Sequence, residues 1–222
     1  MQNKLIESFR NRAKAGPIDW TELRAGASEI VFFGSRALAV HERTSDLDVL
    51  VVGNVSHRIK RAGLDLICIT TSELESADWL TSELAGHISH YGIWAEGCGA
   101  WRFRTLVGQS AVSRKERRIL SLIENAKRAW AQLHPLFQAK YRTIIRRELQ
   151  RLALLRETAP IPPTPLLDAE WRSQRVSKAD LVGIIESIRQ PPASQRPAKH
   201  PRNARCCAET RATVVALNDL LS

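Results

Sequence analysis

Several features that define common protein classes are missing from this chain. Its 222 residues contain no run of about eighteen apolar residues, and no apolar run follows Met1, so we expect neither a membrane-spanning helix nor a secretory signal. The 4 cysteines show no CxxC spacing, which argues against a zinc site, and we interpret them as reduced thiols in a cytoplasmic protein. The segment beginning at Gly97 is not a dinucleotide-binding G-x-G-x-x-G pattern, because Arg102 stands at the last glycine position.

Acidic residues are scarce in the second half of the chain. Residues 1–100 carry 10 Lys and Arg against 13 Asp and Glu, a net charge of −3, whereas residues 101–222 carry 23 against 10, a net charge of +13. This excess predicts contact with a nucleic acid, an acidic protein partner or the triphosphate of a nucleotide. The hydrophobic fraction of 44% is sufficient for a sizeable core.

A short apolar segment ends abruptly at a glycine–serine turn. Residues 30–33 predict a buried strand, and Gly34 allows the backbone to turn tightly and approach a ligand. We expect Ser35 to cap a short helix beginning near Arg36, so that backbone N–H groups and the hydroxyl could hold phosphate. Strand–Gly–Ser turns are also common without function, so this segment alone does not define a site.

Two carboxylates open the next apolar segment, residues 46–52. Asp46 and Asp48 are two positions apart, and because strand side chains alternate, both lie on the same face. Such a pair repels itself and raises its own pKa unless a cation intervenes. Mg²⁺ prefers oxygen ligands and also binds triphosphate, so the pair indicates a magnesium site.

A third carboxylate, Asp65, is the only charge in the apolar segment 64–69. A lone acid between leucines is more often structural than functional. Together with Asp46 and Asp48, however, it supplies the third ligand of a two-metal centre, in which one ion activates the attacking oxygen and the other stabilises the leaving pyrophosphate.

These segments together resemble the polymerase-beta-like nucleotidyltransferase superfamily, in particular the small bacterial minimal nucleotidyltransferases. The shared pattern is an apolar strand, Gly34-Ser35, about ten residues, Asp46-x-Asp48 and then Asp65 on a later strand, and it covers roughly residues 28–97. Two departures are visible. Residues 37–40 lack the additional glycine of many relatives, and only twelve residues separate Val52 from Asp65, too few for the long helix found there in many relatives.

The resemblance implies an α+β fold, with a mixed sheet flanked by helices over residues 1–100 and a basic α-helical C-terminal domain over residues 101–222. It also implies a role for each site residue. Asp46, Asp48 and Asp65 would be the catalytic and metal-binding residues, and Gly34, Ser35 and Arg36 the nucleotide-binding ones.

The expected activity is transfer of a nucleoside monophosphate, most simply AMP from ATP, to a hydroxyl acceptor with release of pyrophosphate. Two Mg²⁺ ions and an NTP are the expected cofactor and donor. The acceptor is left open among a small molecule, a protein hydroxyl such as a toxin tyrosine, and an RNA end. Glu116 and Glu148 are possible general bases from the helical half.

In the first half, we expect helices over residues 4–14 and 72–91. In the second half, we expect helices over 113–133, opened by a capping box at Ser113, and over 136–157, 177–189 and 203–221. Proline-rich segments near 159–165 and 190–202 are expected to be extended or looped.

Two groups of side chains allow more than one interpretation. Four arginines at helical spacings form either a solvated helix face or a phosphate-contacting stripe: Arg142, Arg146, Arg147 and Arg151. His87 and His90, three residues apart in a helical segment, could share a metal, but a core or surface role is favoured because no acidic or cysteine partner is nearby.

A different class of function is also open. The chain could be a catalytically inactive protein of this fold that binds nucleic acid or a toxin partner through its basic helical half. The intact set of Asp46, Asp48 and Asp65 favours the enzyme, and the charge of residues 101–222 favours the binding protein.

Overall fold

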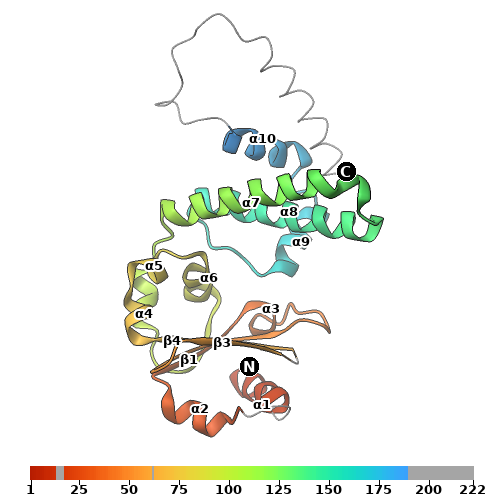
Figure 1. Ribbon diagram of the computed structural model, residues 1–222. Helices are drawn as coiled ribbons and strands as arrows, with labels where there is room; N and C mark the ends of the chain where they lie inside the picture. The colour runs from red at the N-terminus through yellow and green to blue at the C-terminus, as the bar shows by residue number, and fades with distance from the viewer. Residues whose placement is uncertain (14–17, 62, 190–222) are drawn as a thin grey trace, which may run out of the picture. The chain divides into compact units, whose positions relative to one another are not determined.

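The computed structural model describes residues 1–13, 18–61 and 63–189 (Figure 1). The chain divides into two compact units, the first formed by Met1–Ala111 with Glu157–Leu167 and the second by Val112–Arg156 with the described residues from Asp168 onward. Compactness is not a test of independent domains, so the predicted division at residue 100 stays a prediction. The predicted break at residues 16–17, the loop 190–202, the helix 203–221 and the cysteine pair 206–207 lie outside the described residues.

A mixed sheet of 5 strands, in the order β3-β4-β2-β1-β5, forms the centre of the first unit. Its strands are β1 (Glu29–Phe33), β2 (Leu47–Gly53), β3 (His57–Arg61), β4 (Leu64–Thr70) and β5 (Ile93–Glu96). Strands β2 and β4 are parallel, and the other neighbouring strands are antiparallel. This sheet, followed by a helical second half, confirms the predicted α+β fold.

Helices cover both faces of the sheet (Figure 1). One face packs against α1 (Gln2–Ala13) and α2 (Trp20–Gly26), and its core joins Phe9 and Trp20 to alternate residues of the strands. The other face packs against α4 (Thr71–Glu75), α5 (Ala77–Leu80) and α6 (Glu83–Tyr91) through a second core that includes Ile88. Because apolar layers lie on both sides, all five residues of β1 are buried.

The segment 72–91 is helical, as predicted, but it is divided into three separate helices. The side chains of Thr70, Ser76 and Ser82 accept hydrogen bonds from backbone N–H groups at the start of α4, α5 and α6. A hydroxyl at each of these positions satisfies the first free N–H groups of a new helix, which favours three starts over one continuous helix.

Strand β3 was not predicted. It fills the interval between Val52 and Asp65 where many relatives have a long helix, and it pairs antiparallel with β4 at the edge of the sheet. Gly63, with φ of 75°, directly precedes β4. Four of the five β3 residues are exposed, so its sequence has no continuous apolar run that would have revealed it.

The second half is helical, as predicted. After the 3₁₀ helix η1 (Ala100–Arg104), the chain forms α7 (Gln109–Ala129), η2 (Trp130–Gln132), α8 (Pro135–Arg156), α9 (Thr164–Arg172) and α10 (Lys178–Arg189). The predicted capping box at Ser113 is wrong, since α7 begins four residues earlier. Extended structure over 159–165 is correct only as far as Pro163, because α9 begins at Thr164 and Pro165 lies in its first turn, where its missing N–H costs nothing.

Two further expectations concern the described residues. Cys68 is buried and Cys98 exposed, and both are free thiols. Across 1–13, 18–61 and 63–189, the structure contains no helix with the length and apolar character needed to cross a bilayer. The cytoplasmic location stays a prediction.

Candidate active site

Strand register brings the predicted carboxylates together. Asp48 lies directly opposite Asp65 in the parallel β2–β4 pair and opposite Phe33 in the antiparallel β1–β2 pair. Asp46 comes immediately before β2, two residues from Asp48. The three carboxylates therefore gather where β2 and β4 begin and β1 ends, on the sheet face that carries α4–α6.

The glycine turn lies against one of these carboxylates. Gly34 has φ of 73°, and a Cβ placed on it would overlap Asp48 Oδ2. Glycine is therefore required both by the backbone conformation and by the close approach of the carboxylate. The turn opens α3 (Gly34–Ala37), so the predicted cap by Ser35 is wrong: Ser35 lies inside the helix, and the cap residue Phe33 makes no side-chain hydrogen bond.

Asp48 is the carboxylate of this group whose negative charge is least favourable. Burial, followed by the negative charges of Asp65 and Asp46, raises the pKa of Asp48 to about 7. Repulsion among the three acids was expected from the sequence, but its concentration on Asp48 was not. A cation at this position would relieve that repulsion.

Asp65 is compensated by two basic residues of β3 that sequence reasoning missed. Arg58 donates from Nε to Asp65 Oδ1 at 2.8 Å and from Nη2 to Oδ2 at 2.5 Å, and Lys60 Nζ donates to Oδ2 at 3.2 Å. These bonds, the Arg58 bond first, hold the pKa of Asp65 below its ordinary value despite burial. Lys60 also forms an ion pair with Asp46 at 3.1 Å. The sequence did contain an indication of this strand face, because the basic residues Arg58 and Lys60 stand at alternate positions.

Arg36 contacts the backbone that precedes Asp46. Its Nε donates to the Ser45 carbonyl at 2.8 Å, and its Nη2 donates to the Arg43 carbonyl at 3.3 Å. These bonds fix the connection between the glycine turn and the first carboxylate. The roles predicted for Gly34, Ser35 and Arg36 in nucleotide binding stay predictions.

The carboxylates fit a hard divalent cation in part. Asp46 and Asp48 offer oxygen ligands, and the pKa of Asp48 is raised because burial and the charges of Asp65 and Asp46 outweigh the nearby Lys60 and Arg58. Asp65, in contrast, is already bound by Arg58 and Lys60. Within the described part of the chain, no three His, Cys, Asp or Glu side chains are arranged to hold a metal ion.

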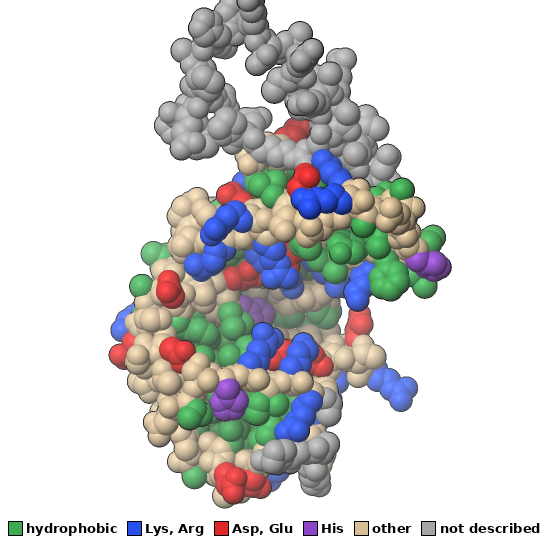
Figure 2. All heavy atoms as spheres, viewed as in Figure 1, with side chains coloured by type: hydrophobic (Ala, Val, Ile, Leu, Met, Phe, Trp, Pro, Cys, Tyr) green, Lys and Arg blue, Asp and Glu red, His purple; other side chains and the backbone are tan. Residues whose placement is uncertain are grey.

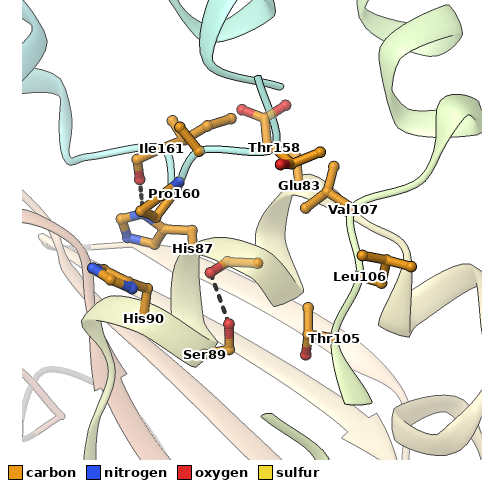
Figure 3. Close-up of a pocket in the computed structure, with 12 residues that line it drawn as sticks. Glu83, His87, Ser89, His90, Thr105, Leu106, Val107, Thr158, Pro160 and Ile161 are labelled. Carbon is orange, nitrogen blue, oxygen red and sulfur yellow. Dashed lines mark hydrogen bonds between the residues drawn. The ribbon is translucent and has the colours of Figure 1, made fainter. Parts of the chain in front are cut away.

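A separate pocket of about 200 Å³ lies beside α6 in the first unit (Figure 3). Glu83, Gly86, His87 and His90 recur at helical spacing along one side, and the non-helical segments 105–107 and 158–161 form the other walls. His87 Nδ1 lies 2.7 Å from the Ile161 carbonyl, which fixes the ring.

This pocket is connected to the glycine turn and contains an unusual hydroxyl. The rings of His87 and Phe33 are 6.1 Å apart, and Phe33 directly precedes Gly34. Thr105 Oγ1 is buried and has no hydrogen-bond partner among the described residues. The pocket lining includes one carboxylate, two imidazoles and three hydroxyls, with no Lys or Arg among its described residues. A shared metal site for His87 and His90 receives no support.

The arginines of α8 do not form an open phosphate-contacting stripe. Asp168 accepts hydrogen bonds from Arg146 and Arg147, and Arg151 donates to Glu148 at 2.8 Å. Arg142 lies over the Trp130 ring at 5.4 Å. The spacing of these arginines in the sequence indicated that they share a helix. It did not indicate their acidic partner, because Asp168 lies on α9.

Neither glutamate suggested as a general base is available for that role. Glu148 is 3% exposed and accepts a hydrogen bond from Lys115 at 2.7 Å. Glu116 is paired with Arg156 at 2.7 Å. Exposed basic side chains of this unit occur on several helices, and those of α7 are Arg114, Arg117, Arg118 and Arg128. Figure 2 shows Lys and Arg side chains on the visible face of the molecule.

Comparison with known proteins gives one family match. Residues 20–96 match the model of a family described as a nucleotidyltransferase domain. That segment contains the glycine turn, all three aspartates, Arg58 and Lys60. No curated protein sequence matches the chain.

Several solved structures are similar at low identity. A nucleotidyltransferase-like protein from Exiguobacterium sibiricum is 13% identical, with coverage of 96% of this chain and 74% of that one and a TM-score of 0.41. Spectinomycin adenyltransferase AAD(9) from Enterococcus faecialis, solved with ATP and spectinomycin, is 14% identical, with coverage of 99% and 98% and a TM-score of 0.48. A toxin–antitoxin structure with AMP-PNP is 17% identical, with coverage of 57% and 98% and a TM-score of 0.27.

Proposed function

Residues 20–96 of this enzyme belong to the nucleotidyltransferase domain family, and from this premise we propose that it transfers AMP from ATP to a hydroxyl group of a small molecule. The observation that carries the proposal is the arrangement of Asp46 and Asp48 beside the Gly34 turn, where burial and the neighbouring acids raise the pKa of Asp48 to about 7 despite Lys60 and Arg58. A divalent cation bound together with a nucleotide triphosphate would relieve the repulsion among these carboxylates.

In the proposed reaction, the acceptor hydroxyl oxygen forms a bond to the α-phosphorus of the nucleotide. The bond between that phosphorus and the bridging oxygen of the leaving group breaks, and pyrophosphate departs with the electron pair. The hydroxyl proton passes to a base or to solvent. Mg²⁺, when bound, supplies charge stabilisation to the attacking and leaving oxygens.

The site residues have separate proposed roles. Asp46 and Asp48 would hold the metal, and Gly34 and Ser35 would contact the nucleotide phosphates. Asp65 would orient the site; proton removal by Asp65 is disfavoured, because Arg58 and Lys60 stabilise its charged form and lower its pKa.

The pocket beside α6 is the proposed acceptor site. It lies on the same sheet face as the carboxylates and is connected to them through Phe33. Its lining, which carries Glu83 but no Lys or Arg among the described residues, suits an uncharged or cationic molecule better than a phosphate-bearing RNA end. The unpaired Thr105 hydroxyl offers a hydrogen bond to such a ligand.

A second candidate is binding of nucleic acid or a toxin-type protein partner without catalysis. It is favoured by the net charge of +13 over residues 101–222 and by the exposed arginines of α7. Binding to an RNA that weakens steeply with salt and is unchanged by Asp48→Ala would support this candidate.

The proposal is tested by measuring the melting temperature with Mg²⁺ and each of the four NTPs. A nucleotide about a hundredfold above its dissociation constant should stabilise the protein by roughly 2.7 kcal/mol. We expect this shift with ATP for the wild type and for the exposed control Asp78→Asn, but not for Asp48→Ala. The absence of a shift with every NTP would contradict the proposal.

A further inference from the structure

The ammonium group of Lys60 lies between two carboxylates of the candidate active site. Its Nζ is 3.1 Å from Asp46 Oδ2 and 3.2 Å from Asp65 Oδ2. Lys60 stands opposite Asp65 in the antiparallel β3–β4 pair, so the register fixes its position beside the acid. A single cation from the edge strand therefore connects residues from two different parts of the chain.

The surroundings of Lys60 allow it to leave. Its side chain is 63% exposed, whereas that of Asp65 is 5% exposed. The lysine stem is therefore not held by core packing, and it can turn towards solvent without disturbing the sheet. Asp65 would remain compensated, because Arg58 binds both of its carboxylate oxygens.

An ammonium group and a divalent cation need the same oxygen lone pairs and bring charge of the same sign. The oxygen of Asp46 that contacts Lys60 is on a residue proposed above as a metal ligand. A divalent cation at Asp46 and Asp48 must therefore displace Lys60 or accept repulsion from it.

We propose that Lys60 is a positioning residue that serves as an exchangeable counter-ion, holding Asp46 and Asp65 together in the metal-free protein and releasing them when a divalent cation binds. The inference rests on the proposed function, because it takes Asp46 and Asp48 as the metal ligands. The inference gives β3 a role before metal binding, which is to hold the carboxylates in place. The nucleotidyl transfer reaction does not itself require such a role.

The test measures Mn²⁺ binding to the whole protein without nucleotide. The electron paramagnetic resonance signal of free Mn²⁺ is the readout. Lys60→Met keeps the apolar stem and removes the charge. Arg61→Met is the matched control, because Arg61 is the next residue of β3, is exposed and points to the opposite face. We expect Lys60→Met to tighten Mn²⁺ binding roughly fivefold, and Arg61→Met to change it less than about twofold.

The outcomes separate this inference from the proposed function. Equal Mn²⁺ affinity in the wild type and Lys60→Met, or weaker binding in Lys60→Met, would overturn the counter-ion role while leaving the metal site intact. Absence of Mn²⁺ binding in every variant, or binding that Asp48→Asn leaves unchanged, would overturn the metal site and the counter-ion role together.

Discussion

Replacing Asp48 with asparagine should stabilise the metal-free protein at neutral pH while removing its activity. The substitution keeps the shape of the side chain, and therefore its contact with Gly34, but removes the half-buried negative charge. The pKa of this carboxyl is about 7 in the folded protein, against an ordinary value of 3.8, because burial and the charges of Asp65 and Asp46 oppose ionisation.

The magnitude follows from linkage between protonation and folding. Below pH 3.8 the carboxyl is protonated in both the folded and the unfolded chain, so it makes no difference to stability. Between the two pKa values the folded chain holds a proton that the unfolded chain has lost, and stability falls as pH rises. Above about pH 7 the full penalty is present, and the two values correspond to about 4 kcal/mol.

The assay is urea denaturation of the wild type and Asp48→Asn in chelator at pH 4 and pH 8. We expect similar free energies of unfolding at pH 4 and an advantage of up to about 4 kcal/mol for the variant at pH 8. The exposed substitution Asp78→Asn serves as a control and should show no such pH-dependent gain. An equal difference between wild type and Asp48→Asn at both pH values would refute the electrostatic reasoning.

Three further perturbations test the surrounding structure. Gly34→Ala should lower stability by roughly 1–2 kcal/mol and should also lower activity, because φ is 73° and the new Cβ would displace the Asp48 carboxylate. Gly26→Ala is the control for the melting and turnover assays. It should lower neither stability nor activity, because nothing lies within 4 Å of the added Cβ. Glu29→Ala should lower the free energy of unfolding by about 3 kcal/mol, because the buried Glu29 carboxylate accepts hydrogen bonds from two indole groups and one backbone N–H. The near-ultraviolet circular dichroism spectrum should change as well. An unaltered spectrum would contradict this prediction. Asp168→Asn should destabilise the second unit by roughly 3 kcal/mol at pH 7. The loss should become smaller on acidification, because the pKa of Asp168 lies below its ordinary value. A loss of unfolding free energy that urea titrations show to be the same in acid would contradict the ion-pair role.

Local sequence was sufficient for the elements that carry the site. The apolar segments 30–33, 46–52 and 64–69 were predicted as strands, and they correspond to β1, β2 and β4 within one residue at each end. Burial on both faces explains this success, because it requires nearly continuous apolar residues that leave the few polar positions conspicuous. Glycine at the turn was also recognisable, since a positive φ and a close approach leave few alternatives.

Errors arose where an element does not require apolar residues or where several local signals compete. Strand β3 is an exposed edge strand whose pairing with β4 stabilises it, so its sequence resembles a polar connection. The hydroxyls of Thr70, Ser76 and Ser82 could be solvent-facing residues of one helix or caps of three, and the actual choice is three caps.

The sequence by itself determined that a glycine turn and three acidic residues lie at the ends of apolar strands, because these depend on local spacing and alternation. Only the tertiary structure decided how the charges are shared. Strand pairing places Arg58 and Lys60 beside Asp65 and leaves Asp48 with the raised pKa, and helix packing assigns Asp168 to the arginines of α8. Electrostatic energies depend on distance and burial between residues remote in sequence, so no reading of local spacing contains them.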